Sequence, residues 1–158
     1  MNKSVFIEYL KFALEQKLLE ATEAANSARA DATHEQSAAE TQYDSLSIEY
    51  GYLAEGQSER VDAMHLAKQT ILNQLALAVG NTITHNALVE IEDEQGNCHW
   101  FYFAPCEGGL KIQYKETPVL VLTFDAPLGK RLKGLTVDED ISFFFNGQPQ
   151  TLTVMQIL

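Results

Sequence analysis

The distribution of proline is the feature that most constrains the fold of this chain. All four prolines lie in the second half, and residues 3–79 contain none. Long helices are therefore possible there, because an internal proline removes a backbone hydrogen bond and clashes with the preceding turn. Apolar or small residues recur at intervals of three and four, the period of one helix face. The first stripe is Leu10, Leu14, Leu18, Ala21, Ala25, Ala28 and Ala32; the second is Leu46, Tyr50, Leu53, Gln57, Val61, Met64, Ala67, Ile71 and Leu75.

These two stripes predict an antiparallel helical hairpin, a coiled-coil arm, over residues 1–79. Neither helix can bury its stripe alone, and the polar run DATHEQSAAETQYDS between them places the tip near residues 36–45. A helix of roughly 35 residues is about 50 Å long, so we expect the arm to project beyond the rest of the chain. The change from leucine to alanine after residue 20 predicts a slender distal part, suited to a narrow site or simply a thin coiled coil.

The hydrophobic period changes at residue 80. Short segments rich in Val, Ile, Phe, Tyr and Thr, separated by the turn sequences DEQGN and NGQP, predict antiparallel strands. Pro127 is placed to open a short helix, and Gly134 to end it. We therefore predict an α+β protein whose residues 80–158 form a small sheet domain with one short helix. The predicted strands are 87–93, 98–104, 119–124, 140–146 and 151–158.

The charge of the chain limits its partners. The formal net charge is −11, and proteins that bind nucleic acid directly rely on Lys and Arg to neutralise phosphates. We expect any role near DNA or RNA to pass through a protein partner. No apolar run approaches the roughly 18 to 20 residues of a membrane helix, and the N-terminal sequence has no signal-peptide pattern. We therefore predict a cytoplasmic monomer that does not bind membranes.

Neither an enzyme active site nor a cofactor site is visible in the sequence. Cys98, His99 and Cys106 match no standard zinc spacing, so we favour plain reduced cysteines over a zinc site. There is no Ser-His-Asp arrangement and no glycine-rich phosphate loop. We predict no enzymatic activity of its own and no cofactor.

Several segments resemble the Gre family of bacterial transcription elongation factors. LTFDAPLGKRLKGLTVDEDISF (122–143) is similar to the family's strand, Ser-Pro-containing helix and approach to the next strand. ALVEIEDEQGNCHWFYFAP (87–105) and GQPQTLTVMQIL (147–158) resemble the first hairpin and the terminal strands of the same domain. In the arm, YDSLSIEYGYLAEGQSERVDAM (43–64) resembles the helix that follows the family's tip.

This resemblance implies an FKBP-like second domain that docks on RNA polymerase, with a coiled coil that enters the secondary channel. It implies polymerase contacts at Asp125, Pro127 and Leu128, where Ala126 replaces the family's serine. The acidic tip of Gre factors helps to hold a magnesium ion at the polymerase active centre, so that water cleaves backtracked RNA. The polymerase is the catalyst, and the factor lends carboxylates.

The tip of this chain departs from the family pattern. The family has Asp and Glu three residues apart before a Glu-Tyr pair; alignment on Glu49–Tyr50 puts Tyr43 and Leu46 in those places. Glu40 and Asp44 are the nearest carboxylates and the candidates for a magnesium ion shared with the polymerase, but their positions differ from the family's, and that ion demands near-octahedral oxygen ligands. We therefore favour an arm that occupies the channel without promoting cleavage. The alternative is an FKBP-like chaperone or protein-interaction module whose arm holds client proteins or dimerises.

Overall fold

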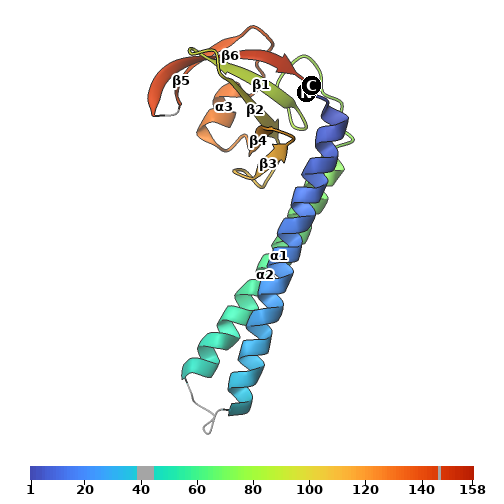
Figure 1. Cartoon of the computed structure of the whole chain (residues 1–158), viewed down its shortest axis with the longest axis vertical. Helices are drawn as coiled ribbons and strands as arrows, with labels where there is room; N and C mark the ends of the chain where they lie inside the picture. Colours follow the sequence, from blue (N-terminus) through green and yellow to red (C-terminus); the bar gives the residue numbers. More distant parts are fainter. Residues whose placement is uncertain (39–44, 146) are drawn as a thin grey trace. The chain divides into compact units, whose positions relative to one another are not determined.

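The chain folds as a helical hairpin and a sheet-containing unit (Figure 1). The computed structural model describes residues 1–38, 45–145 and 147–158. One compact unit is Phe12–Gln69, and the other combines Met1–Lys11 with Thr70–Leu158. The α+β class is confirmed. The ends of both long helices group with the sheet, whereas the sequence analysis assigned all of residues 1–79 to the arm.

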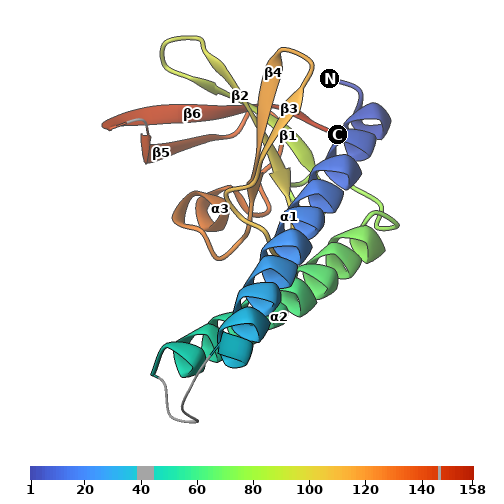
Figure 2. The ribbon, with the colours of Figure 1, turned by 60° about the horizontal axis from the view of Figure 1, so that its bottom comes forward.

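Two long helices, α1 (Lys3–Ala38) and α2 (Ser45–Gln74), run side by side in opposite directions (Figure 2). Every member of the predicted first stripe, from Leu10 to Ala32, is buried. The helix face read from the leucine and alanine spacing is therefore confirmed. Among the described residues, neither of these helices nor any other combines the length and apolarity needed to cross a membrane.

The predicted second stripe departs from the structure at one described position, Leu53. Its other described members are buried at Met64 and Ile71 and half-buried at Tyr50, Gln57, Val61, Ala67 and Leu75. Leu53 is 49% exposed, while the adjacent Ala54 is half-buried. Successive residues on a helix are about 100° apart, so a stripe read at intervals of three and four can select the wrong one of two neighbours. Here the smaller side chain takes the inner position.

Two glycines of α2, Gly51 and Gly56, are expected to weaken the hairpin. Apart from the neighbouring residues and backbone of α2 itself, no atom of the described residues lies within 4 Å of a Cβ added at either position. We predict that Gly51→Ala and Gly56→Ala each raise the free energy of unfolding by about 0.5–1 kcal/mol, because glycine lowers helix propensity by that amount. Urea unfolding followed by circular dichroism measures the change. A loss of stability in either variant would contradict this account of the two glycines.

The sheet has six strands in the order β3-β4-β2-β1-β6-β5. All neighbouring strands are antiparallel except β2 and β4, which pair in parallel from Trp100↔Val119 to Phe103↔Leu122. The sheet is therefore mixed, not wholly antiparallel as predicted. The strands are β1 (Leu88–Asp93), β2 (Cys98–Phe103), β3 (Lys111–Tyr114), β4 (Thr117–Leu122), β5 (Asp140–Phe145) and β6 (Gln148–Ile157).

The mixed sheet arises from β3, a strand that the sequence analysis did not predict. β3 is only four residues long, and its apolar positions Ile112 and Tyr114 alternate with exposed Lys111 and Gln113. Four residues are too short for this alternation to stand out. The chain forms β3 at the sheet edge and returns through a turn at Lys115, where φ is 53°. The following strand then lies between β3 and β2, parallel to β2.

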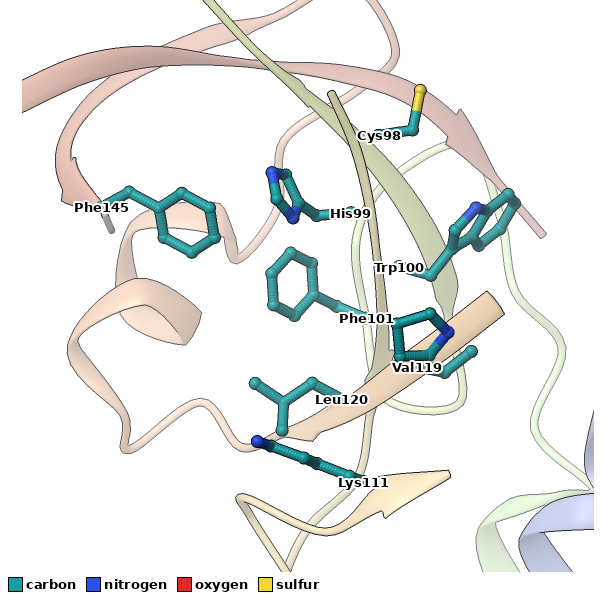
Figure 3. A pocket seen from close by; sticks show the side chains of 9 residues that line it. Cys98, His99, Trp100, Phe101, Lys111, Val119, Leu120 and Phe145 are labelled. Atoms are coloured by element: carbon teal, nitrogen blue, oxygen red, sulfur yellow. The ribbon is translucent and has the colours of Figure 1, made fainter. Parts of the chain in front are cut away.

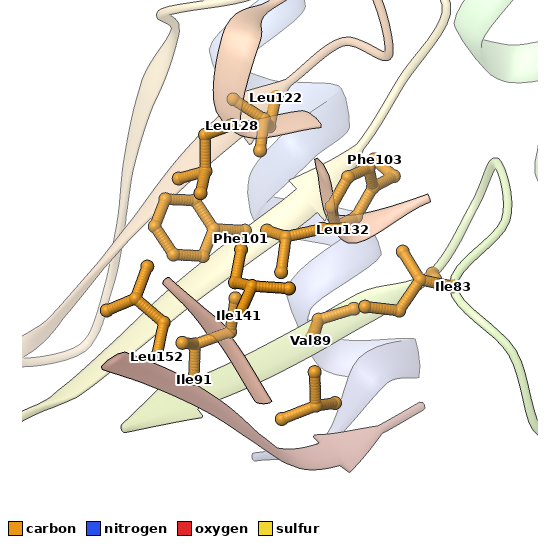
Figure 4. Packing of buried hydrophobic residues seen from close by; sticks show 12 residues of the cluster. Ile83, Val89, Ile91, Phe101, Phe103, Leu122, Leu128, Leu132, Ile141 and Leu152 are labelled. Carbon is orange, nitrogen blue, oxygen red and sulfur yellow. The ribbon is translucent and has the colours of Figure 1, made fainter. Parts of the chain in front are cut away.

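One face of the sheet carries the main hydrophobic core together with the short helix α3 (Pro127–Leu132). Figure 4 shows side chains from the strands and from α3 pointing toward one another. Phe101 and Phe103 of β2 belong to this face, because alternate residues of a strand point to the same side of a sheet. The buried cluster comprises Ile83, Ala87, Val89, Ile91, Phe101, Phe103, Leu122, Leu128, Leu132, Ile141, Leu152 and Val154.

The first turns of α1 pack against aromatic side chains of the sheet. The ring of Phe6 lies 5.4 Å from that of Tyr102, and the ring of Tyr9 lies 5.3 Å from that of Tyr114. Phe6 and Tyr102 are almost fully buried. The start of α1 is therefore part of the sheet unit's core, which explains why residues 1–11 group with it.

Asn86 ties the segment after α2 to the sheet. Its side-chain amide donates to the carbonyl of Leu77 at 2.8 Å and to that of Leu75 at 3.5 Å. Its Oδ1 accepts from the hydroxyl of Tyr102 at 3.1 Å, and burial raises the pKa of Tyr102 to about 12. Asn86 is 2% exposed and has a φ of 68°, a conformation that asparagine adopts more readily than most residues.

We predict that Asn86→Ala lowers the free energy of unfolding by about 2–3 kcal/mol, since it removes buried hydrogen bonds and strains the backbone. Tyr102→Phe is the matched control, because it removes only one of the same bonds and should cost about 1 kcal/mol. Denaturant titration of the three proteins gives both values. An Asn86→Ala variant as stable as Tyr102→Phe would contradict this role.

Asp93 organises the predicted turn at residues 93–97. Its Oδ1 accepts from the backbone N–H groups of Gln95 and Asn97, each at 2.9 Å. Its Oδ2 lies 3.0 Å from Nε2 of His99. Gly96 completes the turn with a φ of 80°. The hydrogen bond with His99, and then that with the Asn97 backbone, hold the pKa of the Asp93 carboxyl well below its usual value.

This depressed pKa predicts a pH-dependent contribution to stability. A carboxyl group whose pKa is lower in the folded chain stabilises the fold above its unfolded pKa of 3.8 and loses that contribution as pH falls. The stability difference between the natural chain and Asp93→Asn should therefore be largest near neutral pH and narrow below about pH 4. Thermal unfolding at a series of pH values tests this. A difference that stays constant down to the acid end would contradict it.

Candidate functional site

The candidate site is the segment that joins β4 to α3 and continues through that helix. Asp125 and Pro127 are exposed at the surface. Leu128 is only 8% exposed and belongs to the hydrophobic core. The structure thus brings the three predicted docking residues together, but it offers only Asp125 and Pro127 to a partner. Leu128 instead anchors the loop by packing into the hydrophobic core.

Gly129 fixes the loop against the helix. A Cβ added to Gly129 would lie 2.0 Å from the carbonyl oxygen of Thr123 and 2.9 Å from its carbonyl carbon. The backbone of Ala126 donates to that same Thr123 carbonyl at 3.2 Å. Only glycine permits this approach, because a Cβ at such distances meets backbone atoms that cannot move aside.

The sequence encodes both ends of the short helix. Pro127 occupies the first turn, where a missing N–H costs nothing. Ala126 precedes it with no side-chain cap, in agreement with the loss of the family's serine hydroxyl noted from the sequence. Beyond the helix, Gly134 has a φ of 81° and donates its N–H to the carbonyl of Ile83 at 2.9 Å. The predicted start at Pro127 is confirmed, and the helix ends at Leu132, two residues before Gly134.

A group of stacked side chains lies directly beside Asp125. The ring of Phe124 stacks on Phe103 at 5.0 Å, and His85 meets it edge-on at 4.7 Å. The ammonium of Lys133 lies 5.2 Å from the Phe124 ring centre. Burial, and then the charge of Lys133, lower the pKa of His85 below its usual value. Both effects favour the neutral form of the His85 ring.

The sequence analysis missed His85 as a neighbour of the site. Forty residues separate it from Asp125, and no motif connects the two positions. Phe124 could have been suspected, because it directly precedes Asp125. The contact depends on the segment before β1 meeting the end of β4, which only the sheet topology reveals.

Exposed positive charge lies next to Asp125. Lys130, Arg131 and Lys133 are all exposed, and the first two occupy the last turn of α3. In a chain of net charge −11, residues 125–133 thus carry exposed groups of both signs. Exposed groups of both signs can orient a protein partner through complementary charges.

The other candidate residues do not form a site in the described structure. Glu40 and Asp44 lie outside the described residues. Cys98 begins β2 and Cys106 follows its far end, so a six-residue strand of about 20 Å separates the two thiols. In the described part of the chain, no three His, Cys, Asp or Glu side chains gather as a metal site.

Comparison with solved structures finds transcription factors of the Gre type. GreA factor homolog 1 of Thermus thermophilus is 20% identical to this chain, with 94% of each chain covered and a TM-score of 0.40. Gfh1 of Thermus aquaticus is 18% identical, covering 91% of this chain and 90% of that one, with a TM-score of 0.41. The elongation factor GreA/GreB of Nitrosomonas europaea is 16% identical, covering 63% of this chain and 89% of that one, with a TM-score of 0.38.

No family model and no curated protein matches the chain. Identities and TM-scores of the size found for the solved structures do not place it in a family. The function is therefore inferred from the residues of the chain itself.

Proposed function

We propose that this protein regulates transcription elongation by binding RNA polymerase through the loop between β4 and α3 and inserting its helical hairpin into the secondary channel. The observation that carries the proposal is the presentation of Asp125 and Pro127 at the surface. They lie in the segment whose sequence resembles the docking region of Gre factors. That segment follows a long helical hairpin in the chain, the same order as in that family.

The loop has the properties of a docking surface. Asp125 and Pro127 are exposed, while Leu128 in the core and Gly129 against Thr123 hold the backbone beneath them. A loop fixed in this way loses little conformational entropy on binding. The neighbouring Lys130 and Arg131 add charge that fits an acidic patch on the partner.

The hairpin has the properties that a narrow channel requires. The buried stripe of α1 beyond residue 20 consists of alanines, from Ala21 to Ala32, and alanine permits close packing of helices. If Glu40 or Asp44 reached the polymerase active centre, it would contribute a carboxylate to a magnesium ion held there. We prefer channel occupancy without cleavage, because the sequence around these residues departs from the Gre pattern.

One observation favours a second function, that of a chaperone-like or dimerising module. The hairpin exposes large apolar side chains: Phe12 is 65% exposed, Leu19 is 49% and Leu66 is 66%. Exposed apolar groups of this kind mark protein-binding surfaces when they are contiguous. Sedimentation of the purified chain and suppression of aggregation of an unfolded client protein test this alternative.

Transcript cleavage on a stalled, backtracked complex tests the proposed function. Purified core polymerase is assayed alone, with this protein, and with its Glu40→Ala and Asp44→Ala variants. We expect no cleavage but protection of the complex from an added Gre factor. If the natural chain promoted cleavage and either variant did not, the protein would still be a polymerase regulator. It would then act by contributing a carboxylate to the magnesium ion, and not by occupying the channel alone. If the protein neither promoted cleavage nor protected the complex, the proposed function would be contradicted.

A further inference from the structure

A pocket of about 380 Å³ lies in the sheet unit, apart from the candidate docking loop. Pro118 and Val119 line it at the beginning of β4, whereas the docking loop follows the end of that strand. Phe101, Leu120 and Phe145 supply apolar walls, and Figure 3 shows their side chains directed into a common space. Pockets of this size and apolar character are typical of small-ligand sites.

A rigid polar group stands on one side of this pocket. The Nε2 atom of His99 is held 3.0 Å from Oδ2 of Asp93, whose side chain is 2% exposed. The ring of Phe145 meets His99 edge-on at 4.9 Å. His99 is thus fixed between a buried carboxylate and an aromatic ring, while its own side chain remains 27% exposed. The wall of the pocket exists before any ligand arrives.

A cation stands on the other side. Lys111 begins β3, and Figure 3 shows its ammonium group beside Leu120, across the pocket from His99. Among the described residues, Lys111 has no carboxylate within ion-pair distance. The pocket therefore combines apolar walls with one ammonium group that is available to a ligand.

Negative charge lies at the His99 end of the pocket. Oδ2 of Asp93 lies 3.0 Å from Nε2 of His99, which lines the pocket. A second negative charge on a ligand would be repelled there, whereas a single carboxylate beside Lys111 would lie on the opposite side of the pocket (Figure 3). A monoanion is the charge that fits.

We propose that this pocket binds a small monocarboxylic acid with an aromatic body. The aromatic body would lie among Phe101, Leu120 and Phe145, where its transfer from water is favourable. The carboxylate would accept a charge-assisted hydrogen bond from Lys111. The site is independent of polymerase binding, since none of these residues belongs to the loop between β4 and α3.

Phenylacetate and its uncharged analogue phenylacetamide test the proposal. Each is titrated into the full ¹⁵N-labelled chain, and backbone amide shifts are followed. We expect saturable shifts near residues 99–101, 111 and 118–120, with phenylacetate binding about fivefold more tightly than the amide, the range of an exposed ion pair. Absence of saturable shifts, or shifts confined to other residues, would overturn the proposal.

Two lysine variants separate a specific role from a general effect of charge. Lys111→Met keeps the apolar part of the side chain and should lower phenylacetate affinity to that of the amide. Lys115→Met, in the turn at the other end of β3, makes the same charge change and should leave the affinity unchanged. Equal affinities for phenylacetate in Lys111→Met and the natural chain would overturn the assignment of Lys111.

Discussion

Gly129→Ala is expected to lower the free energy of unfolding by about 2–3 kcal/mol, although alanine in a helix normally stabilises by about 1 kcal/mol. The added Cβ would lie 2.0 Å from the Thr123 carbonyl oxygen, so either α3 or the loop must move. Leu128 and Leu132 of α3 are core residues, and a displaced helix would open the core beneath them. Equilibrium denaturation measures the loss.

Gly80→Ala is the matched control for this prediction. No atom of the described residues lies within 4 Å of a Cβ added to Gly80, so its stability should stay within about 0.5 kcal/mol of the natural chain. If Gly129→Ala were as stable as Gly80→Ala, the close approach between α3 and Thr123 would not exist in solution.

Asp125→Arg combined with Pro127→Ala is expected to weaken binding to core RNA polymerase at least about tenfold, because charge reversal at a docking surface replaces attraction by repulsion. Both residues are exposed, so the free energy of unfolding should change by less than about 1 kcal/mol. Fluorescence anisotropy of the labelled chain measures the affinity, and denaturation confirms that the fold is intact.

Glu116→Arg provides the control for that experiment. Glu116 is also exposed, and it lies in the turn between β3 and β4, at the opposite end of β4 from the docking loop. The substitution makes the same change in net charge and should preserve binding. Equal loss of affinity in the two variants would mean that net charge, and not the loop, governs the interaction.

Local patterns were sufficient to predict much of this fold. The helical stripe from Leu10 to Ala32 predicted the buried face of α1, because one helix period repeats over many turns. Short runs of β-branched and aromatic residues predicted the strand at 98–104, which the structure has as β2. Pro127 predicted the start of α3. Each of these features depends on residues close together in the sequence.

Features that depend on distant residues could not be predicted in this way. The parallel pairing of β2 with β4 follows from the path of the chain around β3, a strand too short to show its own pattern. The contact between His85 and Phe124 joins two loops with no shared motif. Leu128 was grouped with Asp125 and Pro127 by resemblance, yet helix geometry turns it into the core. Exposure of single loop residues is set by the tertiary fold.

Binding of the full chain to purified core RNA polymerase at moderate salt tests the central claim most directly. We predict a saturable complex with the natural chain, and a weaker complex when Asp125→Arg and Pro127→Ala are combined. An absence of binding by the natural chain, at concentrations where an authentic Gre factor binds, would contradict the account.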